Sequence, residues 1–211
     1  MTPSLRILHC LRAPIGGLFR HVHDLVKGQS ELGLEVGVIC DSETGGVPAG
    51  RALEQLADFC TLGVTRVPMT RQIRPSDFKS YRQVKRLAAR LEANVLHGHG
   101  AKGGAYARLA ARGLKRKKKS VGAFYTPHGG SLHHAPTTLT GRIYVKAEQR
   151  LAPLTDGLIF ESLFAARRFS EFIGPPTCPV CIAFVTSRRA ATVTARPRPP
   201  CAAAFDRPGR R

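Results

Sequence analysis

The sequence contains few acidic residues and no long apolar run. Among its 211 residues, 14 Asp and Glu stand against 33 Lys and Arg, which gives a formal net charge of +19. No segment approaches the roughly 20 apolar residues that a membrane-spanning helix needs, and the first residues lack the apolar stretch of a secretory signal. These absences favour a cytoplasmic protein. Hydrophobic residues make up 43% of the chain, which is enough for a sizeable buried core.

The excess of positive charge suggests nucleic acid or an anionic membrane surface as a partner, so its location matters. Residues 175–211 contain seven Arg, seven Pro and one acid, Asp206, for a local charge of +6. This composition offers little apolar surface to offset the entropy of ordering the chain. We therefore predict a disordered tail over residues 175–211, behind a single domain formed by residues 1–174. Cys178 and Cys181 form a CxxC pair, but a zinc site needs two further ligands at matching spacing.

Short apolar runs alternate with segments of helical periodicity through residues 1–174. Leu5–Leu11 is followed by two glycines, a helical pattern, Gly33 and a second apolar run that starts at Glu35. This strand–helix–strand order implies a parallel sheet. The alternation continues, and it predicts six strands near residues 5–11, 35–40, 61–67, 94–97, 120–125 and 157–160. The predicted fold class is α/β, with a doubly wound, mostly parallel sheet.

Polar residues and glycines gather where the predicted strands end. In a doubly wound sheet, ligands bind beyond the carboxyl ends of the strands, and the helices that follow point backbone N–H groups at anions. This edge therefore suits a phosphorylated or polyhydroxylated small molecule. The residues at the edge are Gly16, Gly17, Asp41, His99, His128, Gly129, Gly130, Glu161 and Ser162.

The first glycine loop differs from the common nucleotide-binding fingerprints. Gly16 and Gly17 follow Pro14-Ile15 without the full G-x-G-x-x-G pattern, and the chain contains no G-x-x-x-x-G-K-[ST] loop. Dinucleotide or ATP binding of those kinds is therefore disfavoured. Glycine at this position still allows a ligand to approach the backbone closely, and a simple tight turn is the alternative.

His128 is the strongest candidate for a reactive side chain. It follows Pro127, which stiffens the loop, and precedes two glycines, which open space around it. A histidine in this setting can exchange a hydrogen bond with a substrate oxygen near neutral pH. His97 and His99 share one face of their strand, but no H-E-x-x-H motif or carboxylate cluster lies near them in the sequence, so no metal site is predicted.

A basic run lies between a predicted helix and the strand that follows it. Three interpretations stay open for this run: a solvated turn, contact with anionic lipid, and contact with nucleic acid. No aromatic residues interleave with the cations, and no recognisable nucleic-acid motif is present, so nucleic acid is not expected. The run consists of Lys115, Arg116, Lys117, Lys118 and Lys119.

Four segments together resemble the N-terminal domain of family 4 glycosyltransferases. They are GGLFRHVHDLVKGQSELGLEVGVICDS, VLHGHGAKGGAYARLAAR, YTPHGGSLHH and LIFESLFAARRF. The resemblance covers roughly residues 4–174. It implies one Rossmann-like half of the two-domain GT-B fold, and an enzyme that transfers a sugar with retention from a nucleotide-sugar to a glycan or lipid-linked acceptor. No cofactor is implied beyond the nucleotide-sugar substrate.

The resemblance also implies roles for particular residues. Gly16 and Gly17 would lie beside the donor pyrophosphate and the reacting sugar, and His128 would face the reaction centre as the catalytic residue. His99 would line the acceptor cleft with Gly129 beside the site. Glu161 and Ser162 would lie near the junction with the second domain. Because members often act on lipid-linked acceptors, the basic run would dock at the inner membrane face.

The chain departs from the family after Ile173. Family members usually carry a second domain with two glutamates in a Glu-x7-Glu pattern, whereas Glu171 is the last Glu here. We therefore expect a truncated enzyme that is inactive alone unless another chain supplies the second domain. We hypothesise that residues 175–211 are a frame-shifted translation of a GC-rich gene, because such translations are rich in Arg, Ala and Pro.

Other functions remain as competitors at this point. One is a non-catalytic module that binds a glycan or a membrane through the N-terminal cleft and the basic run. A second is a nucleic-acid binder driven by charge alone. A third is a Rossmann oxidoreductase, against which the missing G-x-G-x-x-G pattern counts.

Overall fold

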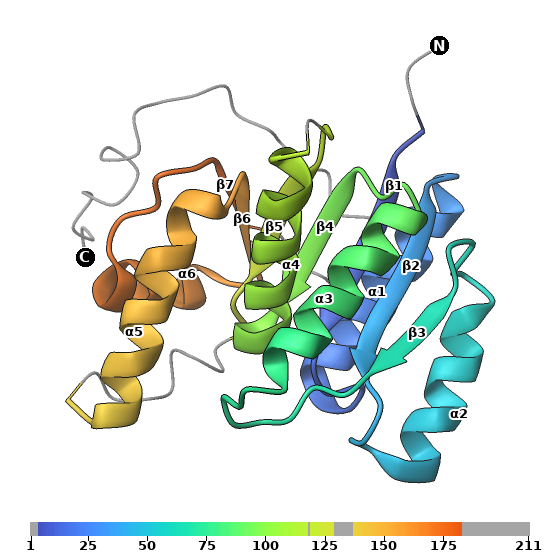
Figure 1. The fold of residues 1–211 in the computed structure, drawn as a ribbon, viewed down its shortest axis with the longest axis horizontal. Coiled ribbons are helices and arrows are strands. Elements are labelled where there is room, and N and C mark those ends of the chain that lie inside the picture. The colour runs from blue at the N-terminus through green and yellow to red at the C-terminus, as the bar shows by residue number, and fades with distance from the viewer. Residues whose placement is uncertain (1–3, 118, 129–136, 183–211) are drawn as a thin grey trace, which may run out of the picture.

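The computed structural model describes residues 4–117, 119–128 and 137–182, and within them one parallel sheet runs through the molecule (Figure 1). The strand order is β3-β2-β1-β4-β5-β6-β7. This order and the parallel pairing of every neighbouring strand confirm the predicted doubly wound α/β fold. The strands are β1 (Arg6–Leu11), β2 (Glu35–Asp41), β3 (Val64–Val67), β4 (Val95–His99), β5 (Gly122–Thr126), β6 (Gly157–Phe160) and β7 (Val180–Ile182).

Helices cover both faces of the sheet, as the near-continuous burial of β1, β2 and β4 requires. One apolar cluster joins Val22 and Val26 of α1 to Leu53 of α2, and another joins Val84 of α3 to Ala107 of α4. In Figure 1, α3 and α4 accordingly lie in front of the sheet and α1 behind it. The helices are α1 (Gly16–Glu31), α2 (Gly46–Ala57), α3 (Asp77–Arg90), α4 (Gly100–Lys115), α5 (Leu139–Leu151) and α6 (Leu163–Ile173), with a short 3-10 turn at Ala152–Leu154.

Glycines let α4 pack unusually close to the sheet. A Cβ atom on Gly103 would lie 2.2 Å from the backbone oxygen of Cys10, and one on Gly98 would lie 2.5 Å from the Cα atom of Gly104. Contacts this short are incompatible with any side chain at these positions. The backbone of α4 therefore rests almost directly on the central strand, β4, and on its neighbour β1.

The sheet extends beyond the boundary predicted from composition. β7 pairs in parallel with β6, with Leu158 opposite Val180, so the prediction that the tail starts at residue 175 was wrong for Val180–Ile182. The apolar run that begins at Val180 is short, but the outer edge of β6 offers unpaired backbone groups that it can satisfy. The remainder of the predicted tail, residues 183–211, lies outside the described residues.

The strand order reverses between β1 and β4, and this is the switch point where doubly wound sheets bind ligands. The register pairs His9 with His97 and Leu11 with His99 across these two strands. Side chains two residues apart on a strand share a face, so His9, His97 and His99 lie on the same side of the sheet. None of the described helices is long and apolar enough to cross a membrane.

Candidate functional site

Five histidines from four segments meet at the switch point. His9 comes from β1, His97 and His99 come from β4, His21 comes from α1, and His128 follows β5. The centres of the His97 and His99 rings lie 4.0 Å apart, and those of His21 and His128 lie 4.9 Å apart. The cluster therefore joins the buried interior of the sheet to its ligand-binding edge.

Four of the close contacts form a continuous chain across the site. Gln29 Oε1 accepts a hydrogen bond from His9 Nε2 at 2.8 Å, and His9 Nδ1 lies 3.0 Å from His99 Nε2. On the other ring edge, His99 Nδ1 lies 3.1 Å from His128 Nε2. His128 Nδ1 then lies 2.7 Å from Glu161 Oε2. Three imidazoles thus connect the Gln29 amide on α1 to a carboxylate at the edge.

Burial keeps the inner histidines in their neutral form. Burial lowers the pKa of His9 to about 4, although the hydrogen bond to Gln29 acts in the opposite direction. Burial, followed by the charges of the neighbouring histidines, lowers the pKa of His97 and His99 well below the usual range. His97 also has a partner of its own, because its Nε2 lies 2.9 Å from Thr126 Oγ1. Near neutral pH these three imidazole rings are therefore uncharged.

His128 occupies a strained backbone position at the end of this chain. Its φ angle is +48°, in the left-handed region that only a few per cent of non-glycine residues adopt. Its side chain is only 4% exposed. Strain of this kind persists where surrounding contacts over-determine the position, which is common at binding and catalytic sites.

Glu161 and Ser162 follow β6 beside His128, but their surroundings differ. The Glu161 side chain is 39% exposed, and the hydrogen bond from His128 lowers its pKa below the ordinary range for a carboxyl. The Ser162 hydroxyl accepts a hydrogen bond from the Ala165 amide at 3.1 Å, so it caps α6. A structural role therefore accounts for Ser162, whereas Glu161 contacts the histidine chain directly.

The glycine loop leaves open space at the start of α1. Gly16 has a φ angle of +73°, which favours glycine, and a Cβ atom at Gly16 or Gly17 would meet nothing within 4 Å. No side chain caps α1 at its N-cap residue, Ile15, and its first turn holds no acidic residue. The N-terminus of a 16-residue helix thus presents its backbone N–H groups at the same edge as the histidines.

Comparison with known families shows to which family the chain belongs. The sequence model of Glycosyltransferase Family 4 matches residues 15–182. The chain belongs to glycosyltransferase family 4. The match spans the glycine loop, four of the five clustered histidines and β7, and it covers the N-terminal domain of the family. It also ends at Ile182, beyond the predicted domain boundary at residue 174.

Individual relatives support the family and the fold. EpsD, a candidate glycosyltransferase of Bacillus subtilis, is 28% identical over 155 residues, which are 73% of this chain and 37% of EpsD. A glycosyltransferase of Rickettsia africae aligns with a TM-score of 0.62 at 14% identity, over 86% of this chain and 43% of that one. Anabaena HepE, solved in complex with UDP-glucose, aligns with a TM-score of 0.60 at 16% identity, over 86% and 44%. The family 4 chain therefore spans less than half the length of these relatives.

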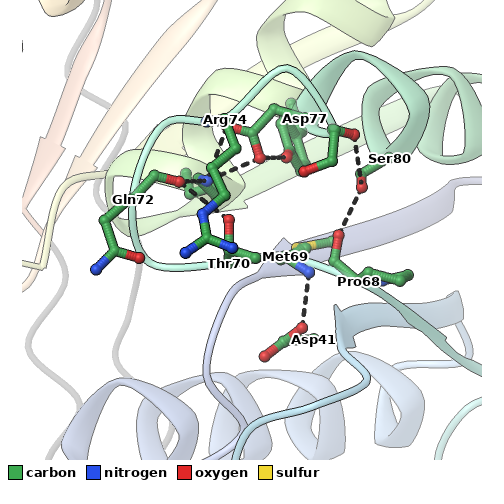
Figure 2. A network of polar contacts seen from close by, with 11 residues as sticks. Asp41, Pro68, Met69, Thr70, Gln72, Arg74, Asp77 and Ser80 are labelled. Atoms are coloured by element: carbon green, nitrogen blue, oxygen red, sulfur yellow. Dashed lines mark hydrogen bonds and ion pairs between the residues drawn. The ribbon is translucent and has the colours of Figure 1, made fainter.

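Asp41 lies at the predicted edge but belongs to a separate polar network (Figure 2). It is buried, and its Oδ1 atom accepts a hydrogen bond from the Met69 amide at 2.7 Å, while Thr44 donates to Oδ2. In the same network Ser80 donates to the Pro68 carbonyl at 2.6 Å. These contacts hold the segment between β3 and α3 in place. Asp41 therefore fixes a loop and does not join the histidine cluster.

The residues of the predicted basic run do not join the histidine cluster. The basic run follows the carboxyl end of α4, at the amino ends of the parallel strands, and so lies at the edge of the sheet opposite the histidines. Lys115 forms an ion pair with Asp156 at 2.5 Å, and Arg116, Lys117 and Lys119 are exposed. Lys118, Gly129 and Gly130 lie outside the described residues.

Sequence reasoning missed two members of the cluster, His9 and His21. His9 lies within an apolar run, which favours interpretation as core, and His21 lies on a helix without a motif around it. These two histidines can be recognised as site residues only once the fold is known, because the strand order places β1 next to β4 and His21 packs against His99 and His128. The contact between Glu161 and His128 was also not foreseen, because the two residues lie far apart in the sequence.

Proposed function

We propose that this chain is the N-terminal, acceptor-side half of a retaining glycosyltransferase that uses a nucleotide-sugar donor. The observation that carries the proposal is His128. It is held in a strained conformation between His99 and Glu161, at the edge where α1 begins. A side chain fixed by contacts on both ring nitrogens suits the precise positioning of a substrate group.

In this proposal the glycine loop binds the donor pyrophosphate, and His128 contacts the donor sugar. The backbone N–H groups at the start of α1 would face the negatively charged pyrophosphate, because an uncapped helix N-terminus attracts anions. The absence of side chains at Gly16 and Gly17 gives the phosphates room. UDP is the nucleotide we favour, since HepE was solved with UDP-glucose and Staphylococcus aureus MnaA with UDP.

The proposed reaction exchanges one bond at the anomeric carbon for another. The bond from this carbon to the donor phosphate oxygen breaks, and the nucleoside diphosphate leaves. An acceptor hydroxyl, on a glycan or a lipid-linked carrier, attacks from the same face and passes its proton to the departing phosphate. His128 would orient and polarise the transferring sugar, and His99 would line the acceptor side. No cofactor is assigned to this transfer.

The chain spans less than half the length of its relatives, and we expect this to limit its activity when it acts alone. The donor nucleotide in the proposed enzyme lies between two domains, and this chain supplies one of them. We therefore propose weak donor binding and little or no sugar transfer unless a second chain provides the missing domain. An affinity in the millimolar range, on the order of −4 kcal/mol, matches a site with half of its contacts.

Binding of UDP-glucose to the full chain tests this proposal. Isothermal titration calorimetry should detect weak, saturable binding, and His128→Ala should weaken it at least tenfold, or about 1.4 kcal/mol. Gly16→Ala should also weaken binding, because its φ angle of +73° is strained for alanine. His23→Ala is the matched control, since His23 lies on the same helix but packs against Phe19 and Phe59.

Two results would overturn the proposal. One is UDP-glucose binding that is unchanged in both His128→Ala and Gly16→Ala, which would move the ligand away from this edge. The other is efficient sugar transfer by the purified chain that His128→Ala leaves intact. Binding of NAD in place of UDP-glucose would favour the oxidoreductase alternative.

The exposed basic run supports a second, weaker proposal of contact with an anionic membrane. Arg116, Lys117 and Lys119 project from the edge opposite the histidines, so docking there would leave the sugar site accessible. Each cation near an anionic surface contributes about 1 kcal/mol. We propose that this face contacts the cytoplasmic surface of the membrane that carries a lipid-linked acceptor.

A further inference from the structure

The directions of the hydrogen bonds in the histidine chain show which nitrogen of His99 faces His128. Gln29 Oε1 can only accept, so His9 Nε2 must donate to it. Neutral His9 then carries a bare lone pair on Nδ1, which accepts from His99 Nε2. Neutral His99 in turn carries a bare lone pair on Nδ1, which faces His128.

The chain from the opposite end reaches the same contact. Glu161 can only accept when it is ionised, so His128 Nδ1 donates to it across 2.7 Å. The other ring nitrogen of His128, Nε2, lies 3.1 Å from His99 Nδ1. A single positive centre, either a proton or a metal ion, can satisfy both of these nitrogens.

A third histidine, His21, lies beside this contact. Among the described residues, His21 Nε2 is one of two buried side-chain nitrogens without a hydrogen-bond partner. Its ring packs edge-on against His128. One nitrogen each from His21, His99 and His128 lie within 4.8 Å of one another. A buried, unpartnered polar atom is costly unless a ligand satisfies it.

We propose that His21 Nε2, His99 Nδ1 and His128 Nε2 form a binding site for a zinc ion. Zinc bonds imidazole nitrogen at about 2.0–2.1 Å, so two ligand nitrogens of a tetrahedral site lie about 3.3 Å apart. The 3.1 Å between His99 and His128 matches this separation within a few tenths of an ångström. His21 needs to move by roughly the difference between 4.8 Å and this value at most. Three histidines leave the fourth position open for water or an anion.

The surrounding contacts are those that orient zinc ligands. A zinc-bound histidine usually donates its other ring N–H to a carboxylate or another acceptor, which fixes the tautomer. His128 donates to Glu161 in this way, and His99 donates to His9. Glu161 and His9 therefore act as positioning residues for the ligands. The same contacts leave His99 Nδ1 and His128 Nε2 facing each other at the proposed site.

A second histidine triad, His9, His97 and His99, is also compact and fully buried. Its nitrogens are already engaged, because His9 bonds Gln29 and His99, and His97 Nε2 bonds Thr126. A metal ion there would have to displace these partners. The first triad, with its unpartnered His21 nitrogen, is the better site.

The zinc site and the proposed sugar transfer share His128, but they are tested separately. Because the ion would occupy His128 Nε2, zinc and a sugar that contacts this nitrogen would exclude each other. Measurements of metal binding use no sugar. Failure of either proposal therefore leaves the other intact.

Metal titration of the full chain tests the site, in a background that removes the competing thiols. Because Cys178, Cys181 and Cys201 could bind zinc on their own, all three are changed to Ser in the chelator-treated protein. Calorimetry with zinc should then show saturable binding of one ion per chain. Cobalt as a spectroscopic substitute should give a tetrahedral spectrum without the charge-transfer absorption of thiolate ligands.

Substitutions then assign the ligands. His21→Ala should weaken zinc binding at least tenfold, and His21→Gln should reproduce the loss if the alanine variant folds poorly. Glu161→Gln should weaken binding about tenfold, because the carboxylate orients His128. His23→Ala on the same helix should bind zinc as tightly as the parent. Circular dichroism of every variant separates a lost ligand from a lost fold.

Three outcomes would overturn the proposal. Zinc binding that disappears with the three cysteines would assign the metal to the thiols. Binding that is unchanged in His21→Ala and His21→Gln would remove the third ligand. Absence of binding, together with a proton detected between His99 and His128 by imidazole NMR at neutral pH, would make the positive centre a proton.

Discussion

Two polar networks lie at the ligand-binding edge of the same sheet, and they differ in how completely their hydrogen bonds are satisfied. In the carboxylate network, Asp41 accepts from Met69 and Thr44, and Asp77 accepts from the Lys102 ammonium at 2.8 Å and the Tyr106 hydroxyl at 2.8 Å. Each carboxylate in this network meets its donors (Figure 2). In the histidine cluster, by contrast, His21 Nε2 has no hydrogen-bond partner, although its ring packs against His128.

This difference in hydrogen bonding distinguishes a network that stabilises the fold from a site that can bind a ligand. A satisfied network gains nothing from an added ligand, and its contacts hold the β3–α3 segment in position. A buried polar atom without a hydrogen-bond partner is destabilising, and an incoming polar or positively charged group can remove this cost. Both networks are buried and both use strand-end residues, so their position at the edge does not distinguish them. The direction of each hydrogen bond does.

The largest expected effect is on stability, when the satisfied network is broken. Asp41→Ala leaves the Met69 amide and the Thr44 hydroxyl without their acceptor, so it should lower the free energy of unfolding by about 2–4 kcal/mol. His21→Ala removes a buried nitrogen that has no partner, and it should change stability by less than about 1 kcal/mol in metal-free protein. Urea unfolding of the two variants measures the contrast. A larger loss for His21→Ala would contradict the distinction.

The acid dependence of stability is a smaller effect of the same network. Burial alone raises the pKa of Asp41, but hydrogen bonds from Thr44 and the Met69 amide outweigh it, and the pKa lies below its ordinary value. The folded state therefore binds its proton at lower pH than the unfolded state, whose Asp pKa is about 3.9. The stabilisation is fully present above that value and disappears as the pH falls through the folded pKa.

Asp41→Asn checks this dependence. The stability difference between the parent and Asp41→Asn should be greatest above about pH 5 and should shrink as the pH falls below about 4. Urea unfolding at a series of pH values gives the difference directly. A difference that grows on acidification would mean that the carboxylate is destabilising in the folded chain.

The smallest effect on stability should come from the basic run, which belongs to neither network. Changing Arg116, Lys117 and Lys119 to Gln should alter the free energy of unfolding by less than about 0.5 kcal/mol, because their side chains are exposed. The same variant should sediment less with anionic vesicles than the parent does, and added salt should weaken the parent's binding. Equal sedimentation of both proteins would remove the membrane proposal. Lys115 is left unchanged because it pairs with Asp156.

Much of the fold follows from local patterns in the sequence. Continuous apolar runs such as Leu5–Leu11, followed by glycines and helical periodicity, predict a parallel sheet, and they locate Gly16, His128 and Glu161 at its edge. β7 was missed because a short apolar run in a Pro- and Arg-rich segment has little local signal, and it pairs only because β6 offers an edge. Long-range context, rather than propensity, decides such a strand.

The site was less accessible to sequence reasoning than the fold. His9 resembles a core residue until β1 is known to pair with β4, which sets it opposite His97. Asp41 resembles a ligand-contacting residue until the Met69 amide is found on its carboxylate. In both cases, the partner lies far along the chain, and no spacing rule connects the two. Residue type and strand-end position therefore predict the edge but not its division into two networks.

The most direct test of this account is a titration of UDP-glucose into the metal-free chain, followed by NMR at both networks. The account predicts saturable shifts in the His128 imidazole signals and in the Gly16 and Gly17 amides, with the Met69 amide unmoved. Shifts at Met69 with His128 unchanged, or no saturable shift at either network, would contradict the assignment of the histidine cluster as the ligand site.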